Sequence, residues 1–304
     1  MTGSECPDAV VGLVTVTYSA GDTLATMLNS LASATSRQVA VVVSDNGSDD
    51  GSLELADRRP GVRVLHNGAN LGFGAGANVG VKALPRYADP VIIVNPDVVF
   101  GPGSIDALID ALARHPRAGA VGPLITTQDG VIYPSARQLP SIATGIGHAV
   151  LGWFWPENPW TRAYRRDHSE PAERQAGWLS GSCLLVRRAA FDQINGFDPA
   201  YFMYFEDVDL GDRLSRAGWQ SVYAPDAVVV HVGGHATSRH RAEMAKVHHA
   251  SAYRYLAGRY RLWWQAPLRW LVWAGLRVRA ALAARVDAVA EGAELPRRRW
   301  PGRH

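Results

Sequence analysis

The chain has 304 residues, of which 47% are hydrophobic and 19% charged, so it can form one large domain or two smaller ones with real cores, and a mainly disordered protein is excluded. The formal net charge of +3 combines two opposed regions: residues 254–304 carry 11 arginines against 3 acidic residues, a net of +8, which leaves 20 basic against 25 acidic residues, a net of −5, in residues 1–253. Such asymmetry indicates a membrane or polyanion contact made by the C-terminal segment.

The cysteines and apolar runs narrow the class further. Cys6 and Cys183 have no paired spacing, which excludes a disulfide framework or a cysteine-based zinc site and makes a reducing cytosol the expected compartment. Residues 1–10 contain acids and no long apolar run, so we expect no signal peptide. The longest apolar run of the aromatic tail, Trp270–Leu276, is far shorter than the ~20 residues that span a bilayer.

Strand-like and helix-like segments alternate along the first hundred residues. Residues 10–16 (VVGLVTV) are β-branched and apolar throughout, which is typical of a strand buried in a parallel sheet. Further strands are predicted at residues 38–43, 62–65 and 91–94, and helices near residues 24–31, from Ser48 or Ser52, and near residues 76–84.

The alternation continues after an interruption. Residues 126–176 are rich in Pro and Trp, and we expect an irregular connecting or acceptor-side segment there. The other predicted elements are a helix at 104–115 capped by Ser104, strands at 118–125, 183–186 and 227–232, a helix end closed by Gly196, and an amphipathic helix within 201–219. We expect a catalytic domain over residues 1–245 and a basic, aromatic helical extension over residues 246–304.

This order of elements predicts the fold class and the place of the site. Alternating strands and helices with short loops specify an α/β fold with an open, mainly parallel sheet and helices on both faces. Such sheets bind ligands at the carboxyl ends of their strands. The polar segments at those ends are Thr17–Ser19, Ser44–Gly51 and Asn95–Val98.

Asp97 is the first candidate for chemistry. A carboxylate at the end of a buried strand, fixed by the preceding Pro96, suits a divalent cation that also binds a substrate diphosphate. Asn-Pro-Asp is also an ordinary turn sequence, so a purely structural role stays open.

Two further segments follow neighbouring strands. Asp45 and Asn46 occupy the place where an acidic residue of nucleotide-binding α/β folds contacts ribose or base, although an Asn-Gly turn would explain them too. The glycine-rich Asn70–Gly80 follows the third strand and not the first, which disfavours a Rossmann dehydrogenase. Its glycines allow close approach of backbone to a ligand or of helix to sheet.

The acidic cluster Glu206, Asp207 and Asp209 begins a predicted helix. Acids in a first turn offset the helix dipole, but three acids among aromatic residues exceed that need, and a carboxylate held among aromatics can act as a general base. His231 ends a β-branched strand and is a credible metal ligand if Asp97 lies nearby, with His235 as a companion.

Seven motifs in order resemble the family 2 glycosyltransferases of the GT-A fold. They are TVTYS, SDNGSDDG, NLGFGAGAN, NPDV, GWLSGSCLLVRR, FMYFEDVDLGDRLSRAGW and HVGG, spread over about residues 10 to 240. Within the family, the resemblance is greatest to rhamnosyltransferases that act on N-acetylglucosaminyl-diphospho-polyprenol in synthesis of the arabinogalactan linker of the cell wall. It implies a Rossmann-like twisted sheet and an inverting, metal-dependent transfer of L-rhamnose from dTDP-L-rhamnose to the 3-hydroxyl of that acceptor, or use of another donor such as UDP-galactofuranose.

The resemblance also implies roles for individual residues. Asp207 looks like the catalytic base, with Glu206 orienting it or contacting the acceptor, and Trp178, Leu179 and Gly181 match the acceptor pocket. Asn95 replaces the first acid of the family's DXD motif, which makes His231 more necessary beside Asp97 as a ligand of Mg²⁺ or Mn²⁺. The residues matching the nucleotide-sugar site are Thr17, Tyr18, Asp45, Asn46, Gly72, Asn78, Asn95 and Asp97.

The tail permits three interpretations. Tryptophans beside arginines from Trp263 to Arg279 would let the segment lie on an anionic bilayer, which predicts a peripheral protein on the inner face of the plasma membrane with a polyprenyl-linked acceptor as partner. Alternatively the helix packs on the domain or forms a homo-oligomer.

Two other classes of protein remain as alternatives. A nucleotidyltransferase would usually show a basic glycine-rich loop after the first strand, where this chain has TYSAGDT. A nucleic-acid-binding protein would explain the tail but not the acidic strand ends, so we expect no nucleic-acid partner.

Overall fold

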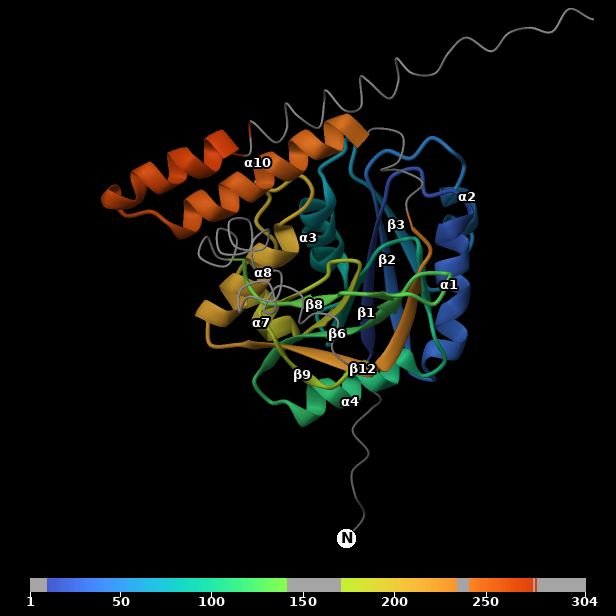
Figure 1. Ribbon diagram of the computed structural model, residues 1–304. Coiled ribbons are helices and arrows are strands. Elements are labelled where there is room, and N and C mark those ends of the chain that lie inside the picture. The colour runs from blue at the N-terminus through green and yellow to red at the C-terminus, as the bar shows by residue number, and fades with distance from the viewer. Residues whose placement is uncertain (1–9, 141–170, 234–240, 276, 278–304) are drawn as a thin grey trace, which may run out of the picture. The chain divides into compact units, whose positions relative to one another are not determined.

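The computed structural model describes residues 10–140, 171–233, 241–275 and 277 (Figure 1). The chain divides into two compact units, Met1–Arg239 and His240–His304. The first contains the sheet and every predicted site residue that the structure describes.

The four strands of the N-terminal half are parallel neighbours. β1 (Val11–Thr17) lies between β2 (Val39–Asp45) and β4 (Val91–Val94), and β3 (Val62–His66) pairs with the far side of β2. Every residue of β1 is buried, because helices cover both of its faces. The predicted parallel core of the sheet is therefore confirmed.

The C-terminal half extends the sheet with strands of mixed direction. β11 (Cys183–Val186) lies antiparallel between β4 and β6 (Ala118–Thr126). β12 (Gln220–His231) runs parallel to β6, and β5 (Val98–Phe100), which the sequence pattern did not predict, pairs antiparallel with β12. The resulting order is β3-β2-β1-β4-β11-β6-β12-β5.

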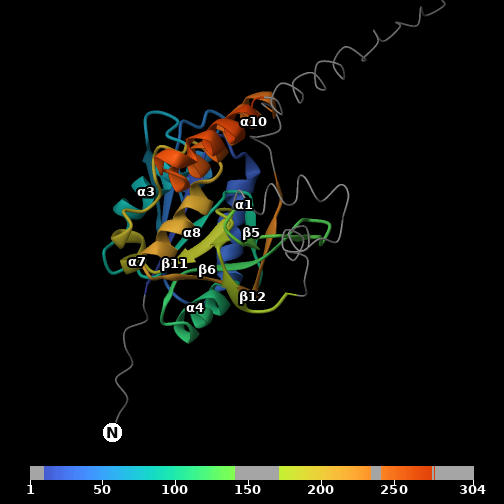
Figure 2. The same ribbon diagram turned by 60° about the vertical axis from the view of Figure 1, so that its left-hand side comes forward.

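Helices form layers on the two faces of the sheet, as Figures 1 and 2 show. On one face, α1 (Asp22–Ala34) and α4 (Ser104–Arg114) pack on the side that includes Leu13. On the other, α3 (Phe73–Ala83), α7 (Arg188–Gln193) and α8 (Glu206–Arg216) pack on the side that includes Val14. Successive residues of β1 thus enter different cores, which is why the strand is apolar without alternation. The short helix α2 (Leu53–Asp57) follows β2.

Two local expectations are corrected. Ser104 is the first helical residue of α4. The N-cap is Gly103, which has a left-handed backbone conformation, and no side chain caps the helix. The segment 126–176 is not wholly irregular, since its described parts form β7 (Ile132–Tyr133), β8 (Ala136–Arg137) and β9 (Arg174–Ala176). Strands of two or three residues are too short to show a periodic pattern. Trp153, Trp155 and Trp160 lie outside the described residues.

The second unit is helical where it is described. It comprises α10 (Arg241–Arg259), the 3₁₀ turn η2 (Trp263–Gln265) and helical residues 266–275. Within the described part of the chain, no helix combines the length and the apolar character needed to cross a bilayer.

Candidate active site

The acidic cluster lies where the chain enters α8. Tyr204 and Phe205 have φ values of 66° and 65°, in the left-handed region that residues with a side chain rarely adopt. Two such residues in succession turn the chain sharply, so that Glu206 and Asp207 become the first residues of the helix. Backbone strain of this kind is concentrated at functional sites.

Asp207 is held by backbone amides. Its Oδ2 accepts a hydrogen bond from the Gly181 amide at 3.0 Å, and its Oδ1 accepts one from the Val208 amide at 2.8 Å. Burial raises the pKa of Asp207, whereas the two amides and the positive charge of Arg137 lower it. The carboxylate is therefore fixed in place and made more basic than an exposed aspartate.

Glu206 is buried beside Asp207 without equivalent support. Its Oε2 has no hydrogen-bond partner among the described residues, and only 7% of the residue is exposed. Burial, together with the charge of Asp207, raises the pKa of Glu206 to about 8. Burial and the neighbouring charge thus favour the neutral form of Glu206, whereas the two amide hydrogen bonds of Asp207 favour its ionised form.

Asp209 has a different place from the other two acids. It lies 2.6 Å from the Nε of Arg213, and that guanidinium also donates to the carbonyls of Ile194 and Gly196. Asp209 thus fixes the loop between α7 and α8. The sequence left the base open among three acids, and this ion pair argues against Asp209.

Asp97 and His231, far apart in sequence, meet at the end of the sheet. Asp97 lies in the turn between β4 and β5, and His231 ends β12, where it pairs with Val98. The Nε2 of His231 is 3.1 Å from Oδ1 of Asp97, and the Val232 amide donates to the Asp97 carbonyl. The structure thus meets the condition under which His231 is a credible metal ligand, namely that Asp97 lies nearby.

The chemistry of this pair suits a divalent cation. A carboxylate and an imidazole are suitable ligands, and such ions commonly complete their shell with water and substrate phosphate oxygens. Within the described part of the chain, no group of three His, Cys, Asp or Glu residues is gathered for a metal. His235 lies outside the described residues.

Residues 181 and 182 connect the two acidic centres. The Gly181 amide binds Asp207, and the carbonyl of the next residue, Ser182, accepts a hydrogen bond from the Asn95 amide at 2.9 Å. Asn95 begins the turn that contains Asp97. Consecutive residues before β11 therefore bring the candidate base and the candidate metal ligand to one edge of the sheet.

Asp45 ends β2 at the same edge. Its Oδ1 accepts a hydrogen bond from the Ser48 amide at 2.9 Å, and its Oδ2 lies 3.2 Å from Nδ1 of His66 at the end of β3. Thr17, at the end of β1, is directly paired with Asp45, and the following residue, Tyr18, is 51% exposed. The hydrogen bond from the Ser48 amide agrees with a turn at Asp45, but the cap of the next helix is Ser52 and not Ser48. The position of Asp45 at the strand end also leaves it among the candidates for nucleotide binding.

The glycine-rich segment joins the two sides of the site. The side chain of Asn46 donates to the Gly72 carbonyl, and the Phe73 amide donates to the Phe202 carbonyl at 3.0 Å. Gly72 has a φ of +83°, and a Cβ there would collide with the Phe202 carbonyl. A glycine is required at this contact between the loop after β3 and the aromatic loop before α8.

Two predicted site residues make structural contacts. The amide of Asn78 bonds to both backbone groups of Phe197, at 2.8 and 2.9 Å, because α3 must be tied to the loop after α7. Leu179 is only 4% exposed and belongs to the core under α8. These contacts give Asn78 and Leu179 structural roles, and their places in the donor and acceptor sites stay predictions, as do those of Trp178 and Gly181.

Sequence reasoning missed two residues of the site. His66 could have been found, because it ends the third strand and parallel pairing places it beside Asp45. Arg137 gave no such signal, since it belongs to the two-residue strand β8 and meets Trp178 only through pairing with β10 (Trp178–Leu179).

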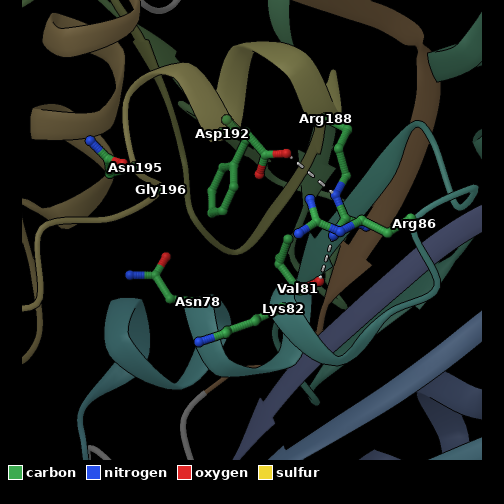
Figure 3. Close-up of a pocket in the computed structure, with 9 residues that line it drawn as sticks. Asn78, Val81, Lys82, Arg86, Arg188, Asp192, Asn195 and Gly196 are labelled. Atoms are coloured by element: carbon green, nitrogen blue, oxygen red, sulfur yellow. Dashed lines mark hydrogen bonds and ion pairs between the residues drawn. The ribbon is translucent and has the colours of Figure 1, made fainter.

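A separate cavity of about 430 Å³ lies at the opposite edge (Figure 3). It adjoins α7, which follows β11 at the position where Val186 pairs with Val91, the first residue of β4. Arg188 in its wall donates to the carbonyls of Val81 and Pro85 and so caps the end of α3. The lining residues are Asn78, Val81, Lys82, Arg86, Arg188, Phe191, Asp192, Asn195 and Gly196, and Asn78 is the one predicted site residue among them.

Comparison with known proteins agrees with this geometry. The family described as glycosyltransferase like family 2 matches residues 7–253. The chain is 55% identical over 286 residues, 91% of its length and 93% of the other, to the N-acetylglucosaminyl-diphospho-decaprenol L-rhamnosyltransferase of Mycobacterium tuberculosis. It is 26% identical over 254 residues, 82% of its length and 93% of the other, to the rhamnosyltransferase WbbL of Escherichia coli.

A solved structure supports the fold. The mannosyltransferase PcManGT of Pyrobaculum calidifontis, in complex with GDP-Man and Mn²⁺, superposes with a TM-score of 0.55 at 17% identity, over 95% of this chain and 81% of that one. The predicted GT-A architecture, a mostly parallel sheet between helical layers, is confirmed.

Proposed function

Because the chain belongs to glycosyltransferase family 2, we propose that it transfers L-rhamnose from dTDP-L-rhamnose to the 3-hydroxyl of N-acetylglucosaminyl-diphospho-polyprenol, with inversion, in synthesis of the arabinogalactan linker. The observation that carries the proposal is the amide-held Asp207 beside the buried Glu206, at the same edge of the sheet as Asp97 and His231. The similarity to the mycobacterial L-rhamnosyltransferase over nearly the whole of both chains supports the choice of donor sugar and acceptor.

The base and its neighbour have distinct roles in this reaction. Asp207 takes the proton from the acceptor hydroxyl, whose oxygen then attacks the anomeric carbon opposite the nucleotide. The Gly181 and Val208 amides hold its carboxylate in one orientation, so the proton acceptor is in position before substrate binds. Glu206 keeps its proton at neutral pH and donates a hydrogen bond to the acceptor.

The other side of the site stabilises the departing diphosphate. Asp97 and His231 are the residues that would hold Mg²⁺ or Mn²⁺, with Asn95 beside them. The cation would supply positive charge to the leaving diphosphate. Asp45 binds the pyrimidine end of the nucleotide, while Thr17, Tyr18 and Asn46 complete that wall.

The second unit provides contact with the membrane in this proposal. Its described residues expose large apolar side chains next to arginines, with Trp263 86%, Trp264 60% and Trp270 69% exposed. Aromatic residues partition to the boundary of water and lipid, and arginines bind anionic headgroups. A peripheral protein on the inner face of the plasma membrane would meet its polyprenyl-linked acceptor there.

The deciding experiment incubates the purified protein with a panel of sugar nucleotides, a divalent cation and a polyprenyl-diphosphate-linked N-acetylglucosamine. We expect transfer from dTDP-L-rhamnose and a disaccharide linked through the 3-hydroxyl. Transfer from UDP-galactofuranose, with none from dTDP-L-rhamnose, would contradict the proposed donor.

Vesicle flotation tests the membrane contact separately. We expect the protein to float with vesicles that contain anionic lipid and to bind neutral vesicles less. Salt-sensitive binding to oligonucleotides, with no binding to the anionic vesicles, would refute it.

A further inference from the structure

Arg137 lies on a short strand that is linked through Trp178 to the helix of the candidate base. β8 and β10 pair so that Arg137 lies directly opposite Trp178, which puts both side chains on the same face of this small sheet. The guanidinium carbon lies 5.8 Å from the centroid of the indole ring, and Nε donates to the Pro134 carbonyl. Stacking and this hydrogen bond together orient the planar cation.

Trp178 in turn lies against the helix that carries Asp207. A Cβ at Gly211 would be 2.8 Å from the Cβ of Trp178, so a glycine is required where the strand crosses α8. Asp207 is one helical turn before Gly211 and therefore on the same face. Consistent with this arrangement, the charge of Arg137 lowers the pKa of Asp207.

The geometry points to Arg137 as the residue that binds the diphosphate of the lipid-linked acceptor. This inference rests on the proposed function, because it takes the acceptor to be a sugar linked to a diphosphate. The attacking hydroxyl must lie at Asp207, and the diphosphate is attached to the same sugar ring. Asp207 itself repels that group, and an oriented guanidinium beside it offsets the repulsion and matches phosphate oxygens.

The chain offers a matched control in Arg174. This arginine on β9 also stacks on an aromatic ring, 5.3 Å from the centroid of Tyr223, and donates to the Ala136 carbonyl. Burial raises the pKa of Tyr223, and the charge of Arg174 opposes that rise. The control therefore removes a stacked guanidinium from the same region of the fold without removing the one that acts on the base.

The test compares two acceptors with each variant. One is N-acetylglucosamine linked to a short prenyl diphosphate, and the other is N-acetylglucosamine with a neutral alkyl chain. For Arg137→Gln we expect kcat/KM to fall about 10- to 100-fold with the diphosphate acceptor and to change less than about threefold with the neutral one. Arg137→Lys should recover part of the loss, and Arg174→Gln should show no dependence on the acceptor.

A second measurement examines binding alone. A prenyl diphosphate without sugar should inhibit the unmodified protein and Arg174→Gln alike, and should inhibit Arg137→Gln about 10-fold less. The donor KM should stay the same in all three. Equal losses of Arg137→Gln with both acceptors, or unchanged inhibition, would overturn the inference and indicate that Arg137 only positions Trp178 or Asp207. If the unmodified protein transfers rhamnose to neither acceptor, the proposed function itself fails, and this inference fails with it.

Discussion

Two buried carboxylates, one on each side of the site, have opposite hydrogen-bonding environments. Asp45 lies on the proposed nucleotide-sugar side, and each of its carboxylate oxygens has a hydrogen-bond partner, the Ser48 amide for one and His66 for the other. Glu206 on the acceptor side is almost as buried, yet its Oε2 has no hydrogen-bond partner among the described residues and its pKa is raised to about 8. Hydrogen bonds offset the cost of removing the Asp45 carboxylate from water, whereas Oε2 of Glu206 has no such compensation among the described residues. In the proposed reaction the proton moves at the side that contains Glu206, which agrees with the tendency of perturbed pKa values to lie at reacting centres.

The largest expected effect comes from removing the proton acceptor. Asp207→Asn keeps the side-chain shape but cannot take a proton, so turnover should fall by about 10²- to 10⁴-fold while binding of the sugar nucleotide is unchanged. Single-turnover kinetics with calorimetric measurement of donor binding would check both. The control is Asp209→Asn, which breaks the ion pair with Arg213 and should cost stability but retain turnover within a few-fold. Near-normal turnover of Asp207→Asn would assign the base elsewhere.

Removing the metal ligand should have the next largest effect, on the donor side. Asp97→Ala should weaken binding of the sugar nucleotide on the order of 100-fold in the presence of Mg²⁺ or Mn²⁺, because the cation supplies several kcal/mol of charge stabilisation. His231→Ala should act in the same direction. Titration of the donor with and without chelator measures the effect, and a loss of affinity that persists equally with chelator would argue that Asp97 only forms the turn.

Substitution of the hydrogen-bonded carboxylate, Asp45, should have a smaller effect on donor binding. Asp45→Asn replaces one acceptor oxygen by a donor that faces His66, so donor affinity should fall about tenfold and the free energy of unfolding by about 1–3 kcal/mol. Donor titration and thermal unfolding report the two losses separately. A loss of stability with unchanged donor affinity would leave Asp45 with its turn role alone.

Glu206→Gln should change turnover least at neutral pH, since a glutamine side chain imitates the protonated glutamic acid. The folded protein holds the Glu206 proton up to about pH 8, while the unfolded chain releases it near the ordinary value of 4.5. The folded state therefore binds more protons in this window, and the stability of the unmodified protein should fall as pH rises from about 4.5 to 8. In Glu206→Gln, the part of the decrease in stability that comes from ionisation of Glu206 should be absent. Equal pH dependence of unfolding in both proteins would show that Glu206 is ionised when folded.

Much of the fold followed from local patterns. Continuous apolar strands such as residues 91–94, with helices between them, indicated a parallel sheet, and Asp45 and Asp97 lie at the carboxyl ends of its strands as the pattern predicted. A motif position did not reveal that the Asn78 amide is hydrogen-bonded to Phe197 or that the Leu179 side chain is buried. Arg137 was missed because its two-residue strand has no periodic signal.

The sequence by itself determined the longer strands and helices and the strand ends at which polar groups accumulate, because periodicity and the order of elements along the chain are properties of neighbouring residues. Only the tertiary structure decided how distant residues combine. It placed His231 against Asp97 through the pairing of β12 with β5, separated Asp209 from Glu206 and Asp207 through Arg213, and set Arg137 beside the base through a strand of two residues. Burial and hydrogen bonding, which set the protonation of each carboxylate, arise from those long-range contacts.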